Sequence, residues 1–335
     1  MPTTFRLPKD EPLLNITSYG RGSPGAPNRL TPAQVEQIRR TVRRTPEAVV
    51  KVLPRSSNDL KAAGKHLDYV GRHGELELEG DDGQRLRGRI SKEIMEDWDL
   101  DIDDIRRHVD LTGQRGRSPP KLIHKLMFSM PPGTPPNKVL GAVRNFAREQ
   151  FALQHRYAFV LHTDEAHPHV HLVLKAVSEQ GIRLNIKKVT LRHWRSEFAR
   201  HLRDLGVAAN ATERAVRGES QSAKKDGIYR ASLRGDSSYV RTRVEAIAKE
   251  LRGGGIRAET GKRVLLQTRS EVMQGWIGVA DRLARSGERE LAADVRNFVD
   301  AMTRPKTDKE LTARDLLVSA RGRKQEPRTI TSSVR

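Results

Sequence analysis

The sequence contains no cysteine, so disulfides, thiolate chemistry and cysteine-type zinc sites are excluded. Any metal ion must therefore be held by histidine or carboxylate side chains. Aromatic residues make up only 4% of the chain, so extensive stacking on nucleic-acid bases is not the expected mode of binding. No run of 18 or more apolar residues occurs, and no basic segment followed by an apolar one begins the chain. We therefore expect no membrane insertion and no secretory signal, which fits a cytosolic protein.

Basic residues are in large excess. The chain has 62 Lys and Arg against 42 Asp and Glu, a formal net charge of +20. Such an excess favours a polyanionic partner, because Lys and Arg that meet phosphates release condensed counterions. An anionic membrane surface would also attract it, but no segment of the chain is apolar enough to span a bilayer.

The pattern of apolar residues indicates strands and helices in alternation, followed by helices alone. The segment between residues 93 and 110 is rich in Asp and Glu, and we interpret it as a solvated helical face rather than a metal site. A hairpin with a turn at residues 80–83 is expected within 75–86. Strands are expected at 48–53, 121–130, 157–161 and 170–177. Helices are expected at 60–73, where Gly74 would end the helix, and at 136–153, 190–205, 239–252, 268–285 and 288–303.

Four of the eleven histidines lie within ten residues, between Leu161 and Leu172. If this segment is a β-hairpin, His169 and His171 share one face of a strand, and His162 ends the neighbouring strand. Three imidazoles then converge and leave open positions on a divalent ion for a substrate oxygen. We predict that these three histidines bind metal and that Asp164 orients one imidazole N–H. A run of surface histidines is the alternative.

Five tyrosines are present, and Tyr69 has the most suggestive surroundings. It flanks the apolar stripe of the helix expected at 60–73, with His66, Arg72 and His73 nearby on adjacent turns. This cationic neighbourhood suits a phosphate. The local sequence alone also permits a tyrosine packed at the core margin with its hydroxyl hydrogen-bonded. The remaining tyrosines lie in the N-terminal arm, at the start of an expected strand, or beyond residue 218: Tyr19, Tyr157, Tyr229 and Tyr239.

The pattern His-x-Asp-x-x-x-Pro-His-x-His at residues 162–171 resembles the metal motif of HUH endonucleases. Among these it is most similar to conjugative relaxases, or mobilisation nucleases, of the T-DNA border type. Residues 64–78 resemble the nucleophile motif of that family, in which a tyrosine lies on the first helix. Residues 127–134 resemble its middle motif, and 205–218 resemble the segment that closes the relaxase domain. The resemblance covers about residues 48–218.

The resemblance implies an α+β fold, in which a central antiparallel sheet is flanked by helices and followed by a helical C-terminal region. It implies a single-stranded DNA endonuclease that uses a divalent metal, Mg²⁺ or Mn²⁺, with Zn²⁺ as an alternative. Tyr69 would attack the scissile phosphate, form a 5′-phosphotyrosine and free a 3′-OH. Ser129 would contact DNA near the nick, with an ordinary serine at the end of a strand as an equal alternative. Further DNA contacts are expected from basic and histidine side chains, although a solvated basic face is an equal alternative for those after residue 186: His66, Arg72, His73, Lys187, Lys188 and Arg192.

We expect four parts: a disordered basic arm at 1–45, the relaxase domain at 46–218, a helical region at 219–303 and a mobile basic tail at 304–335. By the same resemblance the partners are single-stranded DNA at an origin of transfer, relaxosome accessory proteins, and a type IV coupling protein with its secretion system. The expected location is the bacterial cytoplasm, with translocation alongside the DNA in conjugation.

Three other functions remain open from the sequence. A rolling-circle replication initiator uses the same chemistry, but it typically places its tyrosine after the histidines. A hydrolytic metallophosphoesterase would use water, and Tyr69 would then be structural. A non-catalytic DNA-binding module would carry a degenerate site, which the intact three-histidine pattern disfavours.

Overall fold

A computed structural model describes residues 16–19, 29–53, 59–111, 120–220, 231 and 234–325. The chain splits into two compact units, each with its own hydrophobic interior. Unit 1 comprises Met1–Leu13 and Glu36–Thr212, and unit 2 comprises Leu14–Val35 and Glu213–Arg335. Both units are therefore built from segments that are not contiguous in sequence.

Unit 1 contains a six-stranded sheet in the order β1-β4-β6-β5-β2-β3. Every neighbouring pair of strands is antiparallel. The predicted α+β fold with a central antiparallel sheet is confirmed. The strands are β1 (Val49–Val52), β2 (Leu78–Gly80), β3 (Arg85–Leu86), β4 (Ile123–Ser129), β5 (Tyr157–His162) and β6 (His169–Lys175).

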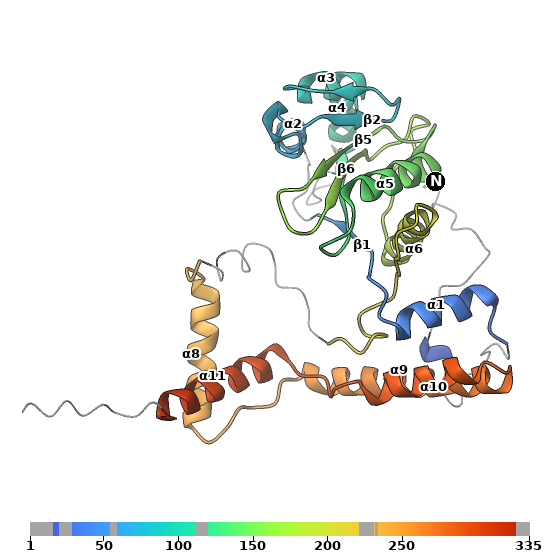
Figure 1. The fold of residues 1–335 in the computed structure, drawn as a ribbon. Coiled ribbons are helices and arrows are strands. Elements are labelled where there is room, and N and C mark those ends of the chain that lie inside the picture. Colours follow the sequence, from blue (N-terminus) through green and yellow to red (C-terminus); the bar gives the residue numbers. More distant parts are fainter. Residues whose placement is uncertain are drawn as a thin grey trace, which may run out of the picture. The chain divides into compact units, whose positions relative to one another are not determined.

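Successive side chains of a strand point to opposite faces of the sheet, so each face has its own hydrophobic core. A different set of helices covers each face (Figure 1). One face packs against α5 (Pro136–Phe151) and α6 (Lys188–Asp204). The other packs against α2 (Leu60–Val70), α3 (Ser91–Asp97) and α4 (Leu100–Leu111). The first core includes Leu126, Phe128, Val170, Leu172, Phe146, Trp194 and Phe198, and the second includes Leu67, Ile94, Trp98, Ile123, Ala158, Val160 and Val173.

Local sequence explains most boundaries within unit 1. Helix α2 begins after Asp59, whose carboxylate accepts a hydrogen bond of 2.6 Å from the Ala62 amide. The helix ends at Val70, earlier than the end expected before Gly74, and Arg72–Gly74 form a separate 3₁₀ turn. The acidic stretch after residue 90 forms two helices instead of one, because Asp99 adopts a positive φ of 49° between them. The predicted hairpin is confirmed, with Leu78 paired to Leu86 and the turn at 81–84.

Unit 2 is helical, and its three predicted helices are present. They are α8 (Ser238–Arg252), α9 (Gly261–Arg285) and α10 (Arg289–Asp300). The α9–α10 pair buries Trp276 against Phe298, whose ring centroids lie 5.4 Å apart. In the part of the chain that the structure describes, no helix combines the length and the apolar character needed to cross a bilayer.

The structure differs from the sequence expectation at both ends. Helix α1 (Pro32–Val42) lies within the arm expected to be disordered, and α11 (Asp308–Gln325) lies within the tail expected to be mobile. Each begins with a reciprocal capping box. Thr31 and Gln34 exchange side-chain bonds with each other's amides at 3.2 and 2.9 Å, and Thr307 and Glu310 do so at 3.2 and 2.8 Å.

The short 3₁₀ helix η1 (Ile16–Tyr19) packs on α9 and also falls within the arm expected to be disordered. Ile16 and Tyr19 are buried, and the Arg282 guanidinium lies 5.1 Å from the centroid of the Tyr19 ring. The backbone of Ile16 approaches α9 so closely at Gly275 that a Cβ there would collide with the Ile16 carbonyl. The N-terminal segment is therefore an integral part of unit 2.

This close approach predicts that Gly275→Ala destabilises the protein. Alanine favours a helix by about 1 kcal/mol over glycine. Here, however, the new methyl group meets backbone, which cannot rotate away, and such overpacking costs about 1–3 kcal/mol. The matched control is Gly261→Ala at the start of α9, where a Cβ meets open space. Urea unfolding followed by circular dichroism should give a lower midpoint for Gly275→Ala than for Gly261→Ala. Equal midpoints would show that η1 does not pack at this glycine.

Candidate active site

The β5–β6 hairpin places the three predicted histidines on one face of the sheet. His162 pairs with His169 across β5 and β6, and His169 in turn pairs with Ser129 on β4. Residues paired directly across antiparallel strands point to the same face, so these side chains form a row. His171 lies two residues further along β6 and therefore shares that face. Val170 and Leu172 point to the opposite face and join the first core, as the alternation predicts.

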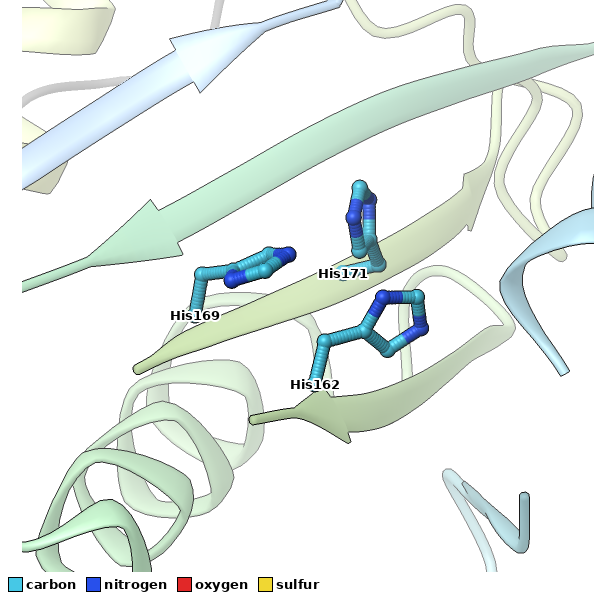
Figure 2. A group of neighbouring side chains, drawn as sticks. All are labelled: His162, His169 and His171. Carbon is cyan, nitrogen blue, oxygen red and sulfur yellow. The ribbon is translucent and has the colours of Figure 1, made fainter. Parts of the chain in front are cut away.

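The three imidazoles form a compact buried cluster (Figure 2). One ring nitrogen from each of His162, His169 and His171 lies within 4.8 Å of the others, and all three side chains are buried. Their ring centroids lie 4.6 to 5.2 Å apart. Within the described ranges, this is the group of histidine and carboxylate side chains whose spacing suits a metal ion.

Backbone carbonyls fix which nitrogen of two rings is free. Nε2 of His162 lies 2.7 Å from the carbonyl oxygen of Val70, and Nδ1 of His169 lies 3.0 Å from that of His167. A carbonyl only accepts, so these two nitrogens carry the proton and donate. Nδ1 of His162 and Nε2 of His169 thus retain a lone pair. Nδ1 of His171 is buried and makes no hydrogen bond within the described part of the chain. A divalent ion fits this donor set, because it would satisfy lone pairs that are otherwise expensive to bury.

The surroundings of two of the three imidazoles favour the neutral form that binds metal. Burial, followed by the positive charge that His162 and His169 carry when protonated, lowers the pKa of His171 to about 3. Burial also lowers the pKa of His162, although its bond to the Val70 carbonyl opposes that shift. Burial therefore favours the neutral imidazole of both His162 and His171.

Helix α2 brings Tyr69 to the same face of the sheet. The buried side of α2 carries Leu67 and Val70, and the Val70 carbonyl bonds to His162 as described. Tyr69 itself is 48% exposed. Its ring stacks against that of His66 at 6.4 Å between centroids, and the Arg72 guanidinium carbon lies 6.0 Å from its centroid. The phenol of Tyr69 is therefore accessible to a substrate.

The other tyrosines have different surroundings. Tyr157 is buried at the start of β5, and burial raises its pKa to about 12. Tyr19 is buried in unit 2, not in an irregular arm. Tyr239 is exposed on α8 of unit 2, and Tyr229 lies outside the described residues. Among the tyrosines of unit 1 that the structure describes, Tyr69 alone is exposed.

Asp164 has a partner that the sequence did not indicate. Its carboxylate forms an ion pair with Arg72, and its other oxygen lies 4.0 Å from Nδ1 of His162. Burial works to raise the pKa of Asp164, but a hydrogen bond from its own amide and the charge of Arg72 hold it below its usual value. The carbonyls of Val70 and His167, rather than Asp164, accept the imidazole N–H bonds in this structure.

The remaining predicted residues separate into two groups. Ser129, His66 and Arg72 lie on or beside the histidine face, and His73 follows α2 in a turn with a positive φ of 55°. By contrast, α6 packs on the opposite face, and three of the residues predicted to contact DNA belong to it or to its N-cap, where that contact stays a prediction: Lys187, Lys188 and Arg192. The sequence located α6 correctly, but periodicity does not tell which face of a sheet a helix covers.

Sequence reasoning missed Lys125 and the orienting carbonyls. Lys125 lies on β4, two residues from Met127 and four from Ser129, so the alternation places it on the histidine face. It is buried, and its charge acts with burial to lower the pKa of His66 to about 3. The alternation of side chains along β4 could have shown that Lys125 shares a face with Ser129. The Val70 carbonyl could not be found in this way, because every residue has one.

The segment that holds the cluster is similar to a known protein family. Residues 82–207 match the family described as "Relaxase: MobA/VirD2-like, nuclease domain". The predicted resemblance to relaxases of the T-DNA border type is confirmed. The matched range contains the three histidines and Ser129, whereas α2 with Tyr69 precedes it.

Two proteins named "T-DNA border endonuclease VirD2" are similar to this chain. The one from Agrobacterium fabrum is 23% identical over 224 residues, covering 58% of this chain and 46% of that protein. The one from Rhizobium rhizogenes is 24% identical over 201 residues, covering 51% and 42%. The chain thus spans somewhat less than half the length of these relatives. A solved structure described as "Molecular Basis of Vancomycin Resistance Transfer in Staphylococcus aureus" aligns at 12% identity with a TM-score of 0.32, covering 50% of this chain and 99% of that one.

Proposed function

We propose that this protein is a metal-dependent relaxase that nicks one strand of DNA at an origin of transfer, with Tyr69 as the nucleophile. The observation that carries the proposal is the hydrogen bond between His162 and the Val70 carbonyl. It ties the buried histidine cluster to the last turn of the helix that presents Tyr69. A nucleophile and a site for phosphate activation are thereby held next to each other, as in-line displacement requires.

The proposed reaction is a transesterification. The Tyr69 hydroxyl oxygen attacks the scissile phosphorus and loses its proton, and the bond from phosphorus to the 3′ oxygen breaks. The leaving oxygen gains a proton and becomes a free 3′-OH, while the 5′ phosphate remains on the tyrosine. One phosphodiester replaces another, so the 3′-OH can later attack the phosphotyrosine and rejoin the strand. A water nucleophile would lose this reversibility.

The chain's own residues divide the remaining work. His162, His169 and His171 would hold a divalent ion, which when bound supplies Lewis-acid stabilisation of charge on the phosphate. Three imidazoles suit a borderline ion such as Zn²⁺ better than Mg²⁺, which prefers oxygen ligands. Ser129 lies beside His169 and would donate to a phosphate oxygen near the nick.

The likeness to the T-DNA border endonucleases supports a role in DNA transfer. On that basis we propose that the protein acts in the bacterial cytoplasm with relaxosome accessory proteins. We also propose that it accompanies the nicked strand to a type IV coupling protein and secretion system, and that unit 2 contributes to this engagement. The net charge of +20 supports a hold on single-stranded DNA that weakens as salt rises.

Single-stranded oligonucleotides tiled across the DNA that flanks the gene should test this function. With Mn²⁺, one of them should yield a protein–DNA adduct that survives SDS, and a released fragment that a polymerase can extend from its 3′-OH. Chelation by EDTA should reduce adduct formation by about 100-fold or more, because the ion contributes several kcal/mol to the transition state. Cleavage without an adduct would indicate a hydrolytic enzyme instead. No cleavage of any oligonucleotide would refute the proposed function.

A further inference from the structure

The turn that follows α2 has an unusual backbone. Arg72, His73 and Gly74 have φ values of 50°, 55° and 100°, so three consecutive residues occupy the left-handed region. Side chains other than glycine rarely adopt this conformation, and it tends to be retained where function requires it. Gly74 is required here, since a Cβ would lie 2.7 Å from the carbonyl carbon of Gly88. The turn is therefore fixed against its surroundings.

The strained turn directs Arg72 toward the metal hairpin. Its guanidinium forms an ion pair with Asp164, which lies 92 residues away in the loop between β5 and β6. It also lies near the Tyr69 ring, as described above. Together with the bond from the Val70 carbonyl to His162, the ion pair attaches the end of α2 to the hairpin at a second point. Tyr69 precedes both attachment points, by one and by three residues.

The ion pair is too exposed to be explained by stability. The Arg72 and Asp164 side chains are 36% and 51% exposed, and exposed pairs of this kind contribute little because water and salt screen them. The backbone of Arg72 nevertheless adopts a rare conformation to make this weak contact. The ion pair therefore serves to position the residues around it. The guanidinium is also engaged by a carboxylate, which makes it a poorer partner for a DNA phosphate than the sequence suggested.

We propose that the Arg72–Asp164 ion pair, called here the latch, positions Tyr69 against the histidine cluster. Arg72 is a positioning residue and Asp164 is its anchor. The inference rests on the proposed nicking function. Opening the latch frees the last turn of α2 from the loop at 163–168, so the phenol oxygen samples positions away from the phosphate. The rate of the chemical step falls, because a misplacement of about 1 Å can cost on the order of 100-fold, while DNA binding is kept.

The first test measures binding and chemistry separately in the full-length protein. Arg72→Ala, Asp164→Ala and the double variant should each form the adduct about 10- to 100-fold more slowly at saturating protein and Mn²⁺. The double variant should be no slower than the singles, because both break one contact. The charge-swapped variant, Arg72→Asp with Asp164→Arg, should recover at least part of the rate. Arg85→Ala is the matched control, since it breaks another exposed pair of unit 1, with Glu77 at 3.6 Å.

Salt dependence separates the latch from a phosphate contact. If Arg72 contacted DNA, Arg72→Ala would reduce the slope of log affinity against log salt by about 0.7 and weaken binding without slowing the bound complex. The latch predicts an unchanged slope and a slower step. A lowered slope, additive effects in the double variant, or a rate equal to that of Arg85→Ala would each overturn the proposal.

The second test does not depend on activity, so it separates failure of the latch from failure of the proposed function. The chain has no cysteine, so spin labels can be placed at two exposed positions through Lys65→Cys on α2 and Glu165→Cys in the hairpin loop. Electron paramagnetic resonance should give a narrow distance distribution for this pair. Adding Arg72→Ala or Asp164→Ala should broaden it, and adding Arg85→Ala should not. An unchanged distribution in the latch variants would refute the latch even if the protein proved to have another activity.

Discussion

Replacing Tyr69 with phenylalanine should abolish the covalent DNA adduct, to less than about one thousandth of the wild-type rate. Phenylalanine keeps the ring, and with it the stacking on His66 and the contact with Arg72. It deletes only the hydroxyl oxygen, which belongs to a side chain that is 48% exposed. The fold should therefore be unaffected, and affinity for single-stranded DNA should change little. The adduct is measured on SDS gels with a labelled oligonucleotide and Mn²⁺.

Tyr239→Phe provides the matched control. Tyr239 is also exposed on a helix beside an arginine, with its hydroxyl oxygen 3.3 Å from a guanidinium nitrogen of Arg243, but it belongs to unit 2. This variant should form the adduct at the wild-type rate. If Tyr69→Phe still forms an adduct, another tyrosine is the nucleophile, and mass spectrometry of the adducted peptide identifies which of the other four it is. If cleavage persists without an adduct, water is the nucleophile.

The histidine cluster was accessible from sequence because its geometry is local. Two short strands joined by a tight connection fix the relative positions of His162, His169 and His171 through pairing and alternation alone. The same locality explains why the hairpin at 75–86 and the helices of unit 2 were predicted. Both missed helices, α1 and α11, also carried readable signals, the Thr-x-x-Gln and Thr-x-x-Glu capping boxes at Thr31 and Thr307.

Long-range features were not accessible in the same way. The pairing of Arg72 with Asp164 spans 92 residues, and it depends on how α2 crosses the sheet. The face covered by α6 is likewise set by packing, so the sequence did not show that α6 lies on the face opposite the histidines. The approach of η1 to Gly275 joins the two ends of the chain. A helix or strand period specifies which residues share a face, but it does not specify which partner that face meets.

His171→Ala should remove metal binding and reduce adduct formation by about 100-fold or more. His171 is the ligand whose loss should matter most. Its Nδ1 is buried without a hydrogen bond in the described structure, and its imidazole is held neutral. Without it, two imidazoles remain, and the affinity for Mn²⁺ should fall below detection in a calorimetric titration. Binding of single-stranded DNA and its dependence on salt should stay close to wild type, because those are set by Lys and Arg.

His124→Gln distinguishes loss of metal from loss of fold. His124 is another partly buried histidine of the same sheet, and its Nε2 lies 3.2 Å from the Leu184 carbonyl on the face that α5 and α6 cover. Burial lowers its pKa to about 4, so it too is neutral at pH 7. Glutamine can still donate to the carbonyl, so this variant should bind Mn²⁺ and form the adduct as the wild type does.

Full adduct formation by His171→Ala would show that the histidine cluster does not hold the required metal. Loss of Mn²⁺ binding in His124→Gln would instead indicate that the titration follows the stability of the sheet. His171 and His124 lie on opposite faces of one sheet. If only His171→Ala loses Mn²⁺ binding, the ion lies on the face that α2 covers.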